Sequence, residues 1–128
     1  MKKILFVCVE NSNRSQMAEA FAKIHGAGKV EAYSSGSRPS GIINPKAIAA
    51  MKELGYDLSK HDSKSLDEIP KIHYDYAITM GCGDECPFVI ADHRMDWQLP
   101  DPKHMEPAAF NKVRDEIEQR VLDLIKDF

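Results

Sequence analysis

The chain has few cysteines, no long apolar run and no cluster of basic residues. Its three cysteines are an odd number among 128 residues, which does not suit a framework of structural disulfides. The apolar run near the amino terminus ends at about Val9, too early for a secretion signal, and no stretch approaches the length of a membrane span. We therefore expect a cytoplasmic protein without a membrane partner, whose cysteines serve thiol chemistry or bind a metal.

The charge balance also limits the partners of this chain. The formal net charge is −3, and 29% of the residues are charged. Because there is no basic tract, there is no electrostatic basis for binding nucleic acid, and an anion has to be captured by a local site. The length and a hydrophobic content of 43% suit one domain over residues 1–128, which we expect to be a monomer.

Segments with the patterns of strands and helices alternate along the chain. Apolar runs predict buried strands, whereas apolar residues three and four apart, preceded by capping residues, predict helices. This alternation indicates an α/β fold: a single domain with a four-stranded parallel sheet flanked by helices on both faces. The expected strands cover residues 3–9, 29–33, 76–80 and 94–97, and the expected helices cover residues 15–25, 45–54, 65–68 and 107–128.

The most informative segment runs from Cys8 to Arg14, reads C-V-E-N-S-N-R and is followed by Ser15. It lies between an expected strand and an expected helix, where open α/β sheets bind ligands. Backbone amides, a helix N-terminus and a bidentate guanidinium together bind tetrahedral oxyanions, and the same surroundings favour the thiolate form of a cysteine. We expect Cys8 to attack the bound oxyanion. The expected oxyanion-binding residues are Val9, Glu10, Asn11, Ser12, Asn13, Arg14 and Ser15.

On the residues alone, other interpretations of this loop and of two later segments stay open. A cysteine at the end of a buried strand is commonly a small core residue, and an Asp-Pro pair such as Asp101-Pro102 is commonly a turn. Cys82 and Cys86 can be incidental thiols in a turn, half of a zinc site or a redox pair. Their spacing matches structural zinc sites poorly and no histidine lies within several residues, which favours a redox pair over a metal site.

The loop resembles that of the low-molecular-weight protein tyrosine phosphatase superfamily, and residues 11–19 are similar to those of its arsenate reductase branch. The resemblance extends from residue 3 to about residue 125. It implies that Asp101 is the general acid that protonates the leaving oxygen, and that Cys82 and Cys86 form a disulfide relay with Cys8. The further matching segments are residues 33–36, 44–48, Cys82 with Cys86-Pro87, Asp101-Pro102 and residues 113–117.

Two departures from the family pattern refine this expectation. Phosphotyrosine-directed members usually carry an aromatic pair after the Asp-Pro, whereas residues 103–105 here are Lys, His and Met, which favours a small inorganic oxyanion. Glu19, Asn11 and Ser34 match a potassium site of some relatives. Lys64, however, stands at the remaining carboxylate position of that site, where its ammonium group can replace the cation. We therefore expect no bound metal.

The resemblance implies an arsenate reductase that works through Cys8, Cys82 and Cys86, with Arg14 and Asp101 assisting. Arsenate is the expected substrate, with phosphate or sulfate as competing oxyanions. We expect no bound cofactor and an external reductant, with a thioredoxin-like protein favoured over glutaredoxin or a small thiol by the pair of late cysteines. Two alternatives remain: a phosphatase that acts on phosphotyrosine, and a non-enzymatic thiol sensor or carrier of trivalent arsenic or a soft metal.

Overall fold

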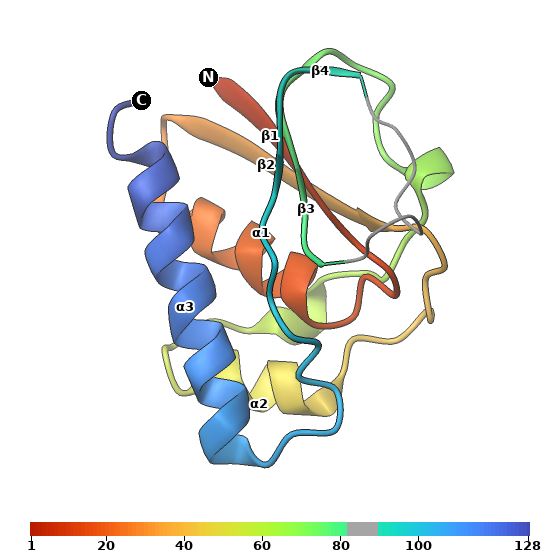
Figure 1. Ribbon diagram of the computed structural model, residues 1–128, viewed down its shortest axis with the longest axis vertical. Helices are drawn as coiled ribbons and strands as arrows, with labels where there is room; N and C mark the ends of the chain where they lie inside the picture. Colours follow the sequence, from red (N-terminus) through yellow and green to blue (C-terminus); the bar gives the residue numbers. More distant parts are fainter. Residues whose placement is uncertain (82–89) are drawn as a thin grey trace.

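The fold is built around one sheet of four parallel strands in a computed structural model that describes residues 1–81 and 90–128 (Figure 1). The spatial order of the strands is β2-β1-β3-β4, so β1 is a central strand with a neighbour on each side. The predicted α/β fold with a four-stranded parallel sheet is therefore confirmed. The strands are β1 (Lys2–Cys8), β2 (Val30–Gly36), β3 (Tyr74–Thr79) and β4 (Ala91–Asp96).

Local sequence signals decide where the helices begin. The Asn44 side chain accepts a hydrogen bond of 2.9 Å from the Lys46 amide and caps the helix that Pro45 opens. Further along, the Ser65 amide donates to the Glu68 carboxylate at 2.7 Å. None of the described helices is both long enough and apolar enough to cross a membrane. The α-helices are α1 (Arg14–His25), α2 (Pro45–Lys52) and α3 (Pro107–Ile125), and the 3-10 helices are η1 (Leu58–Lys60) and η2 (Leu66–Glu68).

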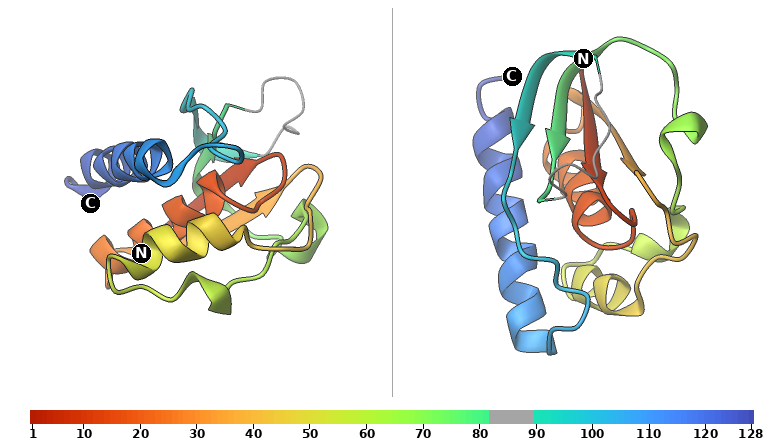
Figure 2. Two further views of the ribbon diagram at one scale, coloured as in Figure 1. Left: turned by 90° about the horizontal axis from the view of Figure 1, so that it is seen from below. Right: turned by 45° about the vertical axis from the view of Figure 1, so that its right-hand side comes forward.

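The two faces of the sheet bury different parts of the chain. On β1, Ile4 and Phe6 belong to the core that includes the buried residues of α1, α2 and α3. Leu5 and Val7 alternate with them and face the other way, where Leu66 of η2 packs against their cluster. In each view η2 lies on the side of the molecule away from α3 (Figures 1 and 2). The three α-helices thus share one face of the sheet, and the segment with the short helix η2 covers the other.

Helix α3 shows how well helical periodicity predicts burial. Most of the apolar residues spaced three or four apart are buried, whereas Leu124 is only partly buried; the buried ones are Phe110, Val113, Ile117 and Val121. The helix ends at Ile125 rather than at Phe128. Phe128 instead lies beyond the helix, with its ring centroid 5.4 Å from that of Tyr76.

Helix α2 is shorter than the sequence predicts. It ends at Lys52 rather than at the expected residue 54, and Leu54 is 44% exposed. The chain turns at Gly55, whose φ of 81° lies in the region that favours glycine. The buried face is formed instead by two alanines and Met51, so this helix packs closely against the core.

The carboxyl end of β1 lies at the edge of the sheet where α/β folds bind ligands. Cys8 is paired with Gly36 at the end of β2, and the Met80 amide just beyond β3 donates to the Val7 carbonyl at 2.9 Å. Because β2 and β3 lie on opposite sides of β1, the sheet order reverses at this point. The expected switch point therefore holds Cys8 and the loop that follows it.

Packing of α3 against the sheet should contribute strongly to stability. Ile117 is fully buried, so Ile117→Ala should lower the free energy of unfolding by about 2–5 kcal/mol through lost burial and the cavity that remains. The exposed Lys112 on the same helix is the matched control, and Lys112→Ala should change it by less than about 0.5 kcal/mol. Urea unfolding followed by circular dichroism measures both, and equal effects of the two substitutions would contradict this account of the core.

Candidate active site

The carbonyl groups of the loop between β1 and α1 accept hydrogen bonds from donors outside the loop. Because a peptide N–H points opposite to its C=O, outward carbonyl bonds turn the following amides toward the inside of the loop. The loop therefore presents a ring of backbone donors, the arrangement that a tetrahedral oxyanion requires. The Ser37 amide donates to the Cys8 carbonyl (3.2 Å), and the Arg38 amide donates to the Val9 carbonyl (2.8 Å). The Glu10 carbonyl accepts from the Ser40 amide (3.1 Å) and the Ser63 hydroxyl (2.9 Å). The Asn44 amide donates to the Ser12 carbonyl (3.2 Å).

Two backbone positions allow this tight loop. Asn11 adopts a left-handed φ of 51°, which asparagine tolerates better than most residues. Gly36 lies directly beside the loop, and a Cβ there would be 2.6 Å from the Val9 carbonyl oxygen and 3.0 Å from the Asn11 Cβ. A larger residue at Gly36 would therefore push the loop away from β2.

The Cys8 thiol is buried, with 3% of the residue exposed, and lies against α1. Its Sγ is 2.9 Å from the Ser15 Oγ, which in turn accepts a hydrogen bond of 2.8 Å from the Asn11 Nδ2. Because the Ser15 oxygen already accepts a hydrogen bond from Asn11, its own hydrogen can point at the sulfur. A hydroxyl that donates to sulfur stabilises the thiolate, which is the nucleophilic form.

The Arg14 guanidinium is held in place at the mouth of the loop. Arg14 is 5% exposed, and its Nη1 donates to the Leu99 carbonyl at 2.9 Å. Gly81 lies beside it with a φ of 77°, and a Cβ at Gly81 would be 2.9 Å from the Arg14 Nη1 and 2.8 Å from the Leu99 oxygen. Glycine is therefore required here both by the backbone conformation and by the close approach of the guanidinium.

Asp101 lies next to Arg14. Its Oδ2 is 4.0 Å from the Arg14 Nη2, and its side chain is 48% exposed. The Lys103 amide donates to the Asp101 Oδ1 at 3.1 Å, and the Lys103 ammonium bridges to the Glu10 carboxylate at 2.8 Å. The hydrogen bond from Lys103 to Glu10, together with their charges, raises the pKa of Lys103 above its ordinary value. This bridge ties the segment that carries Asp101 to the oxyanion loop.

A buried carboxylate lies beneath the loop. Glu19 is 5% exposed; its carboxylate accepts from the Lys23 ammonium (2.7 Å) and the Ser34 hydroxyl (2.5 Å), and lies 3.8 Å from the Lys64 ammonium. Burial by itself raises the pKa of Glu19, but the hydrogen bonds from Lys23 and Ser34 and the positive charge of Lys64 outweigh it and lower that pKa. Two ammonium groups thus balance the carboxylate that resembles a cation ligand of some relatives.

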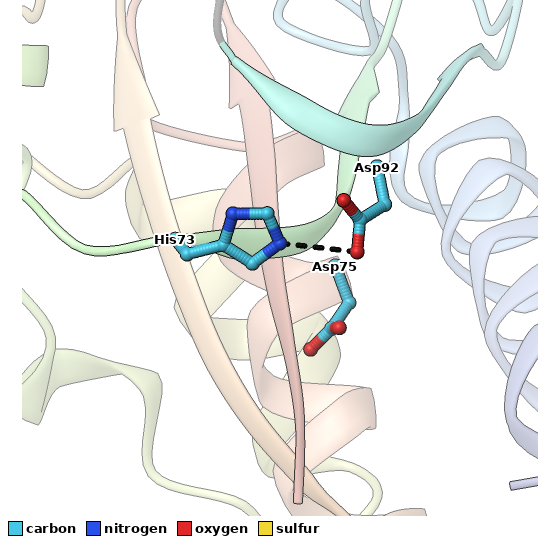
Figure 3. A group of neighbouring side chains, drawn as sticks. All are labelled: His73, Asp75 and Asp92. Atoms are coloured by element: carbon cyan, nitrogen blue, oxygen red, sulfur yellow. Dashed lines mark ion pairs between the residues drawn. The ribbon is translucent and has the colours of Figure 1, made fainter.

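Within residues 1–81 and 90–128, the side chains that gather closely enough to share a metal ion are His73, Asp75 and Asp92 (Figure 3). They lie near the amino ends of β3 and β4, away from the carboxyl end that carries Cys8. These groups already have partners: the His73 Nε2 is 3.0 Å from the Asp92 Oδ2, and the Asp75 Oδ2 accepts from the Lys3 amide at 2.8 Å. The expectation that this protein holds no metal stays a prediction.

The structure places Arg14 and Asp101 beside the loop residues between Val9 and Ser15, which follow Cys8, and the roles of these residues stay predictions. Asn13 directly precedes α1 without a side-chain cap, and its Oδ1 is buried without a hydrogen-bond partner among the described residues. Cys82 and Cys86 lie outside the described residues, so the relay stays a prediction.

Several contributors to the site were not predicted from the sequence. The Leu99 carbonyl and Gly81 hold Arg14, while Gln16 and His61 support the loop from below. Gly81 could have been singled out as the residue directly after a buried strand and before Cys82. Leu99 and His61 carry no local sign of their role, because their partners Arg14 and Gln16 lie 85 and 45 positions away along the chain.

Comparisons with known proteins agree with this geometry. Residues 3–128 match the model of the family described as low molecular weight phosphotyrosine protein phosphatase. The chain is 43% identical over 128 residues to a glutaredoxin arsenate reductase from Synechocystis sp., with 98% of this chain and 97% of that protein covered.

The solved structures that resemble this chain include arsenate reductases. An arsenate reductase in the phosphate-binding state is 42% identical, has a TM-score of 0.88 and covers 99% of this chain and 98% of its own. A thioredoxin-dependent arsenate reductase from Corynebacterium glutamicum is 35% identical with a TM-score of 0.81, and the match covers 99% of this chain and 61% of that one. With a match over nearly its whole length, this chain belongs to the low molecular weight phosphotyrosine protein phosphatase family.

Proposed function

We propose that this protein is an arsenate reductase in which Cys8, Cys82 and Cys86 act in turn. The observation that carries the proposal is the loop itself, whose carbonyl groups are bonded outward and in which the fixed Arg14 lies near a buried thiol 2.9 Å from the Ser15 hydroxyl. Relatives over almost the full length of the chain are named arsenate reductases, which supports arsenate as the substrate. Phosphate and sulfate have the same tetrahedral shape and should compete for the loop.

The first step is attack by the Cys8 thiolate on arsenic. The loop amides and Arg14 neutralise the charge of arsenate and align it above the sulfur. As the S–As bond forms, one oxygen leaves as water, and Asp101 supplies the proton that this oxygen needs. The half-exposed position of Asp101, 4.0 Å from Arg14, suits a group that must exchange protons with solvent between turnovers.

The second step is the redox step. The Cys82 thiolate attacks the Cys8 sulfur, the S–As bond breaks, and its electron pair stays on arsenic, which leaves as arsenite. Cys86 then attacks Cys82, which frees Cys8 and leaves a Cys82–Cys86 disulfide. Cys82 directly follows Gly81, which borders Arg14, so the attacking thiol belongs to a segment that starts at the site.

An external dithiol should then reduce the Cys82–Cys86 disulfide. A thioredoxin-like protein suits this step, because a disulfide between two protein cysteines is its substrate class. One similar protein is named for glutaredoxin and another for thioredoxin, so both reductants belong in the assay.

Arg14→Lys should weaken oxyanion binding and slow the reaction together. Lysine keeps the charge but lacks the planar fork that bonds the Leu99 carbonyl and an oxyanion at once. A charge-assisted hydrogen bond contributes about 1.5–3 kcal/mol, so phosphate should bind about ten- to hundredfold more weakly. Protection of Cys8 from alkylation by phosphate measures the affinity. Arg120→Lys, on the surface of α3, is the control and should bind phosphate like the parent protein.

Asp101→Asn should separate acid catalysis from binding. Asparagine preserves the size of the side chain but cannot supply the proton, so turnover should fall by about 10²–10⁴-fold while phosphate protection of Cys8 stays nearly unchanged. The control is Asp127→Asn at the exposed carboxyl end of the chain. Parent-like turnover of Asp101→Asn, measured where the chemical step limits the rate, would remove Asp101 from the mechanism.

Serine variants of Cys82 and Cys86 distinguish an arsenate reductase from a phosphatase and from a thiol sensor or carrier. Cys82→Ser should release no arsenite but retain any slow hydrolysis of aryl phosphates, because that reaction needs only the loop and Asp101. Cys86→Ser should release about one arsenite per molecule without external reductant and then stop with Cys8 and Cys82 joined.

Rapid mixing and a non-reducing peptide digest measure these outcomes, with thioredoxin and glutaredoxin systems tested on the parent protein. Aryl-phosphate hydrolysis without arsenate-dependent consumption of reductant would indicate a phosphatase instead. Tight binding of trivalent arsenic without either activity would indicate a sensor or carrier.

A further inference from the structure

Below the loop, a continuous chain of side-chain hydrogen bonds ends at the Cys8 sulfur. It starts in the segment that follows α2 and crosses the first turn of α1. Gln16, at its centre, is fully buried. The successive bonds join the Tyr56 hydroxyl to the His61 Nε2 (2.6 Å), the His61 Nδ1 to the Gln16 Oε1 (2.9 Å), the Gln16 Nε2 to the Asn11 Oδ1 (2.8 Å), the Asn11 Nδ2 to the Ser15 Oγ (2.8 Å), and the Ser15 Oγ to the Cys8 Sγ (2.9 Å).

Backbone groups fix the direction of the bonds at Asn11. The Asn11 Oδ1 lies 2.9 Å from the Lys64 amide nitrogen, which can only donate. The oxygen and nitrogen of the Asn11 side chain are therefore assigned without ambiguity. The Asn11 nitrogen faces Ser15 and must donate to its hydroxyl oxygen.

The same reasoning fixes Gln16 and His61. The Gln16 Nε2 faces two backbone carbonyl oxygens, of Asp62 at 2.8 Å and of Asn11 at 3.1 Å, which can only accept. The Gln16 Oε1 therefore faces the His61 Nδ1, and this nitrogen must carry a hydrogen. If the imidazole is neutral, its Nε2 is an acceptor, and the Tyr56 hydroxyl donates to it.

The surroundings of His61 favour the neutral ring. Burial lowers the pKa of His61, the charge of Glu19 opposes this effect, and the charges of Lys23, Lys64 and Lys60 add to it. The carboxylate that faces the ring is Glu19, whose Oε2 lies 3.6 Å from the Nδ1. The net result is a pKa below the ordinary value of 6.5, which favours the neutral ring at neutral pH.

We propose that His61, held as the Nδ1–H tautomer by Tyr56, is a positioning residue for Cys8. Every bond from the Tyr56 hydroxyl to the Ser15 hydroxyl donates in the same direction, and the last hydrogen points at the sulfur. The segment after α2 thereby helps to keep Cys8 in the thiolate form between turnovers. This inference rests on the proposed role of Cys8 as nucleophile and adds two residues that do not touch the substrate.

The pH dependence of Cys8 alkylation in the full-length protein tests the inference. Iodoacetamide reacts with the thiolate, and the Cys8 peptide is followed by mass spectrometry over a pH series. In His61→Ala the Gln16 oxygen loses its donor and the amides of Gln16 and Asn11 are held less firmly. The midpoint of Cys8 alkylation should then rise by about one pH unit. In Tyr56→Phe the ring stays but its tautomer is no longer fixed, and the midpoint should rise by a smaller amount.

Two further variants separate positioning from general damage. His61→Asn retains an amide donor close to the place of the Nδ1 and should restore the midpoint toward the parent value. His25→Ala removes the histidine at the end of α1, which is paired with Glu118 at 2.8 Å, and should leave the midpoint unchanged. Thermal unfolding checks that each variant is folded; if His61→Ala is not, Tyr56→Phe decides.

Parent-like alkylation midpoints in folded His61→Ala or, failing that, in folded Tyr56→Phe would overturn the inference. An equal rise in His61→Asn and His61→Ala would also overturn it, because the donor at the Nδ1 would then be irrelevant. The alkylation assay contains no arsenate. If the parent protein shows a low alkylation midpoint but does not reduce arsenate, the proposed function is wrong. The role of the hydrogen-bond chain is then still tested by the alkylation midpoints of the variants.

Discussion

The site depends on one constraint, namely that the carbonyl groups of the loop after β1 find hydrogen-bond donors outside the loop. Buried backbone groups must be paired, and here the donors come from residues 37–44 and from Ser63. Pairing the carbonyls outward leaves the amides directed inward, toward the place above Cys8. Gly36 permits this by letting β2 run against the loop. The segment between β2 and α2 is therefore as much a part of the oxyanion site as the loop itself.

Arg14 shows how several segments converge on a single charge. It begins α1, yet its guanidinium is oriented by the carbonyl of Leu99 and fits only because residue 81 is glycine. Asp101 lies two residues beyond Leu99, and the bridge between Lys103 and Glu10 closes the same segment onto the loop. The binding group and the proposed acid are thus positioned by one stretch of chain, so a change that displaced it would affect both.

The polar layer beneath the loop has a different purpose from the apolar core beside it. Glu19, Gln16 and His61 are all buried, and each is paired within this layer, which avoids the cost of an unpaired buried group. Fully paired polar networks hold side chains in one orientation more strictly than apolar packing does. A fixed orientation suits a site in which, as proposed, the hydrogen of the Ser15 hydroxyl has to point at the Cys8 sulfur.

The sequence by itself determined the α/β fold, the first strand and the placement of Cys8 and Arg14 after it, because these follow from local periodicity and from a short contiguous motif. Only the tertiary structure decided that Leu54 is exposed, that Leu99 orients Arg14, and that His61 supports Cys8 through Gln16. The bond from Arg14 to Leu99 spans 85 positions and that from His61 to Gln16 spans 45. Such contacts leave no periodic pattern, because they depend on which loops the crossovers of the sheet bring together in space.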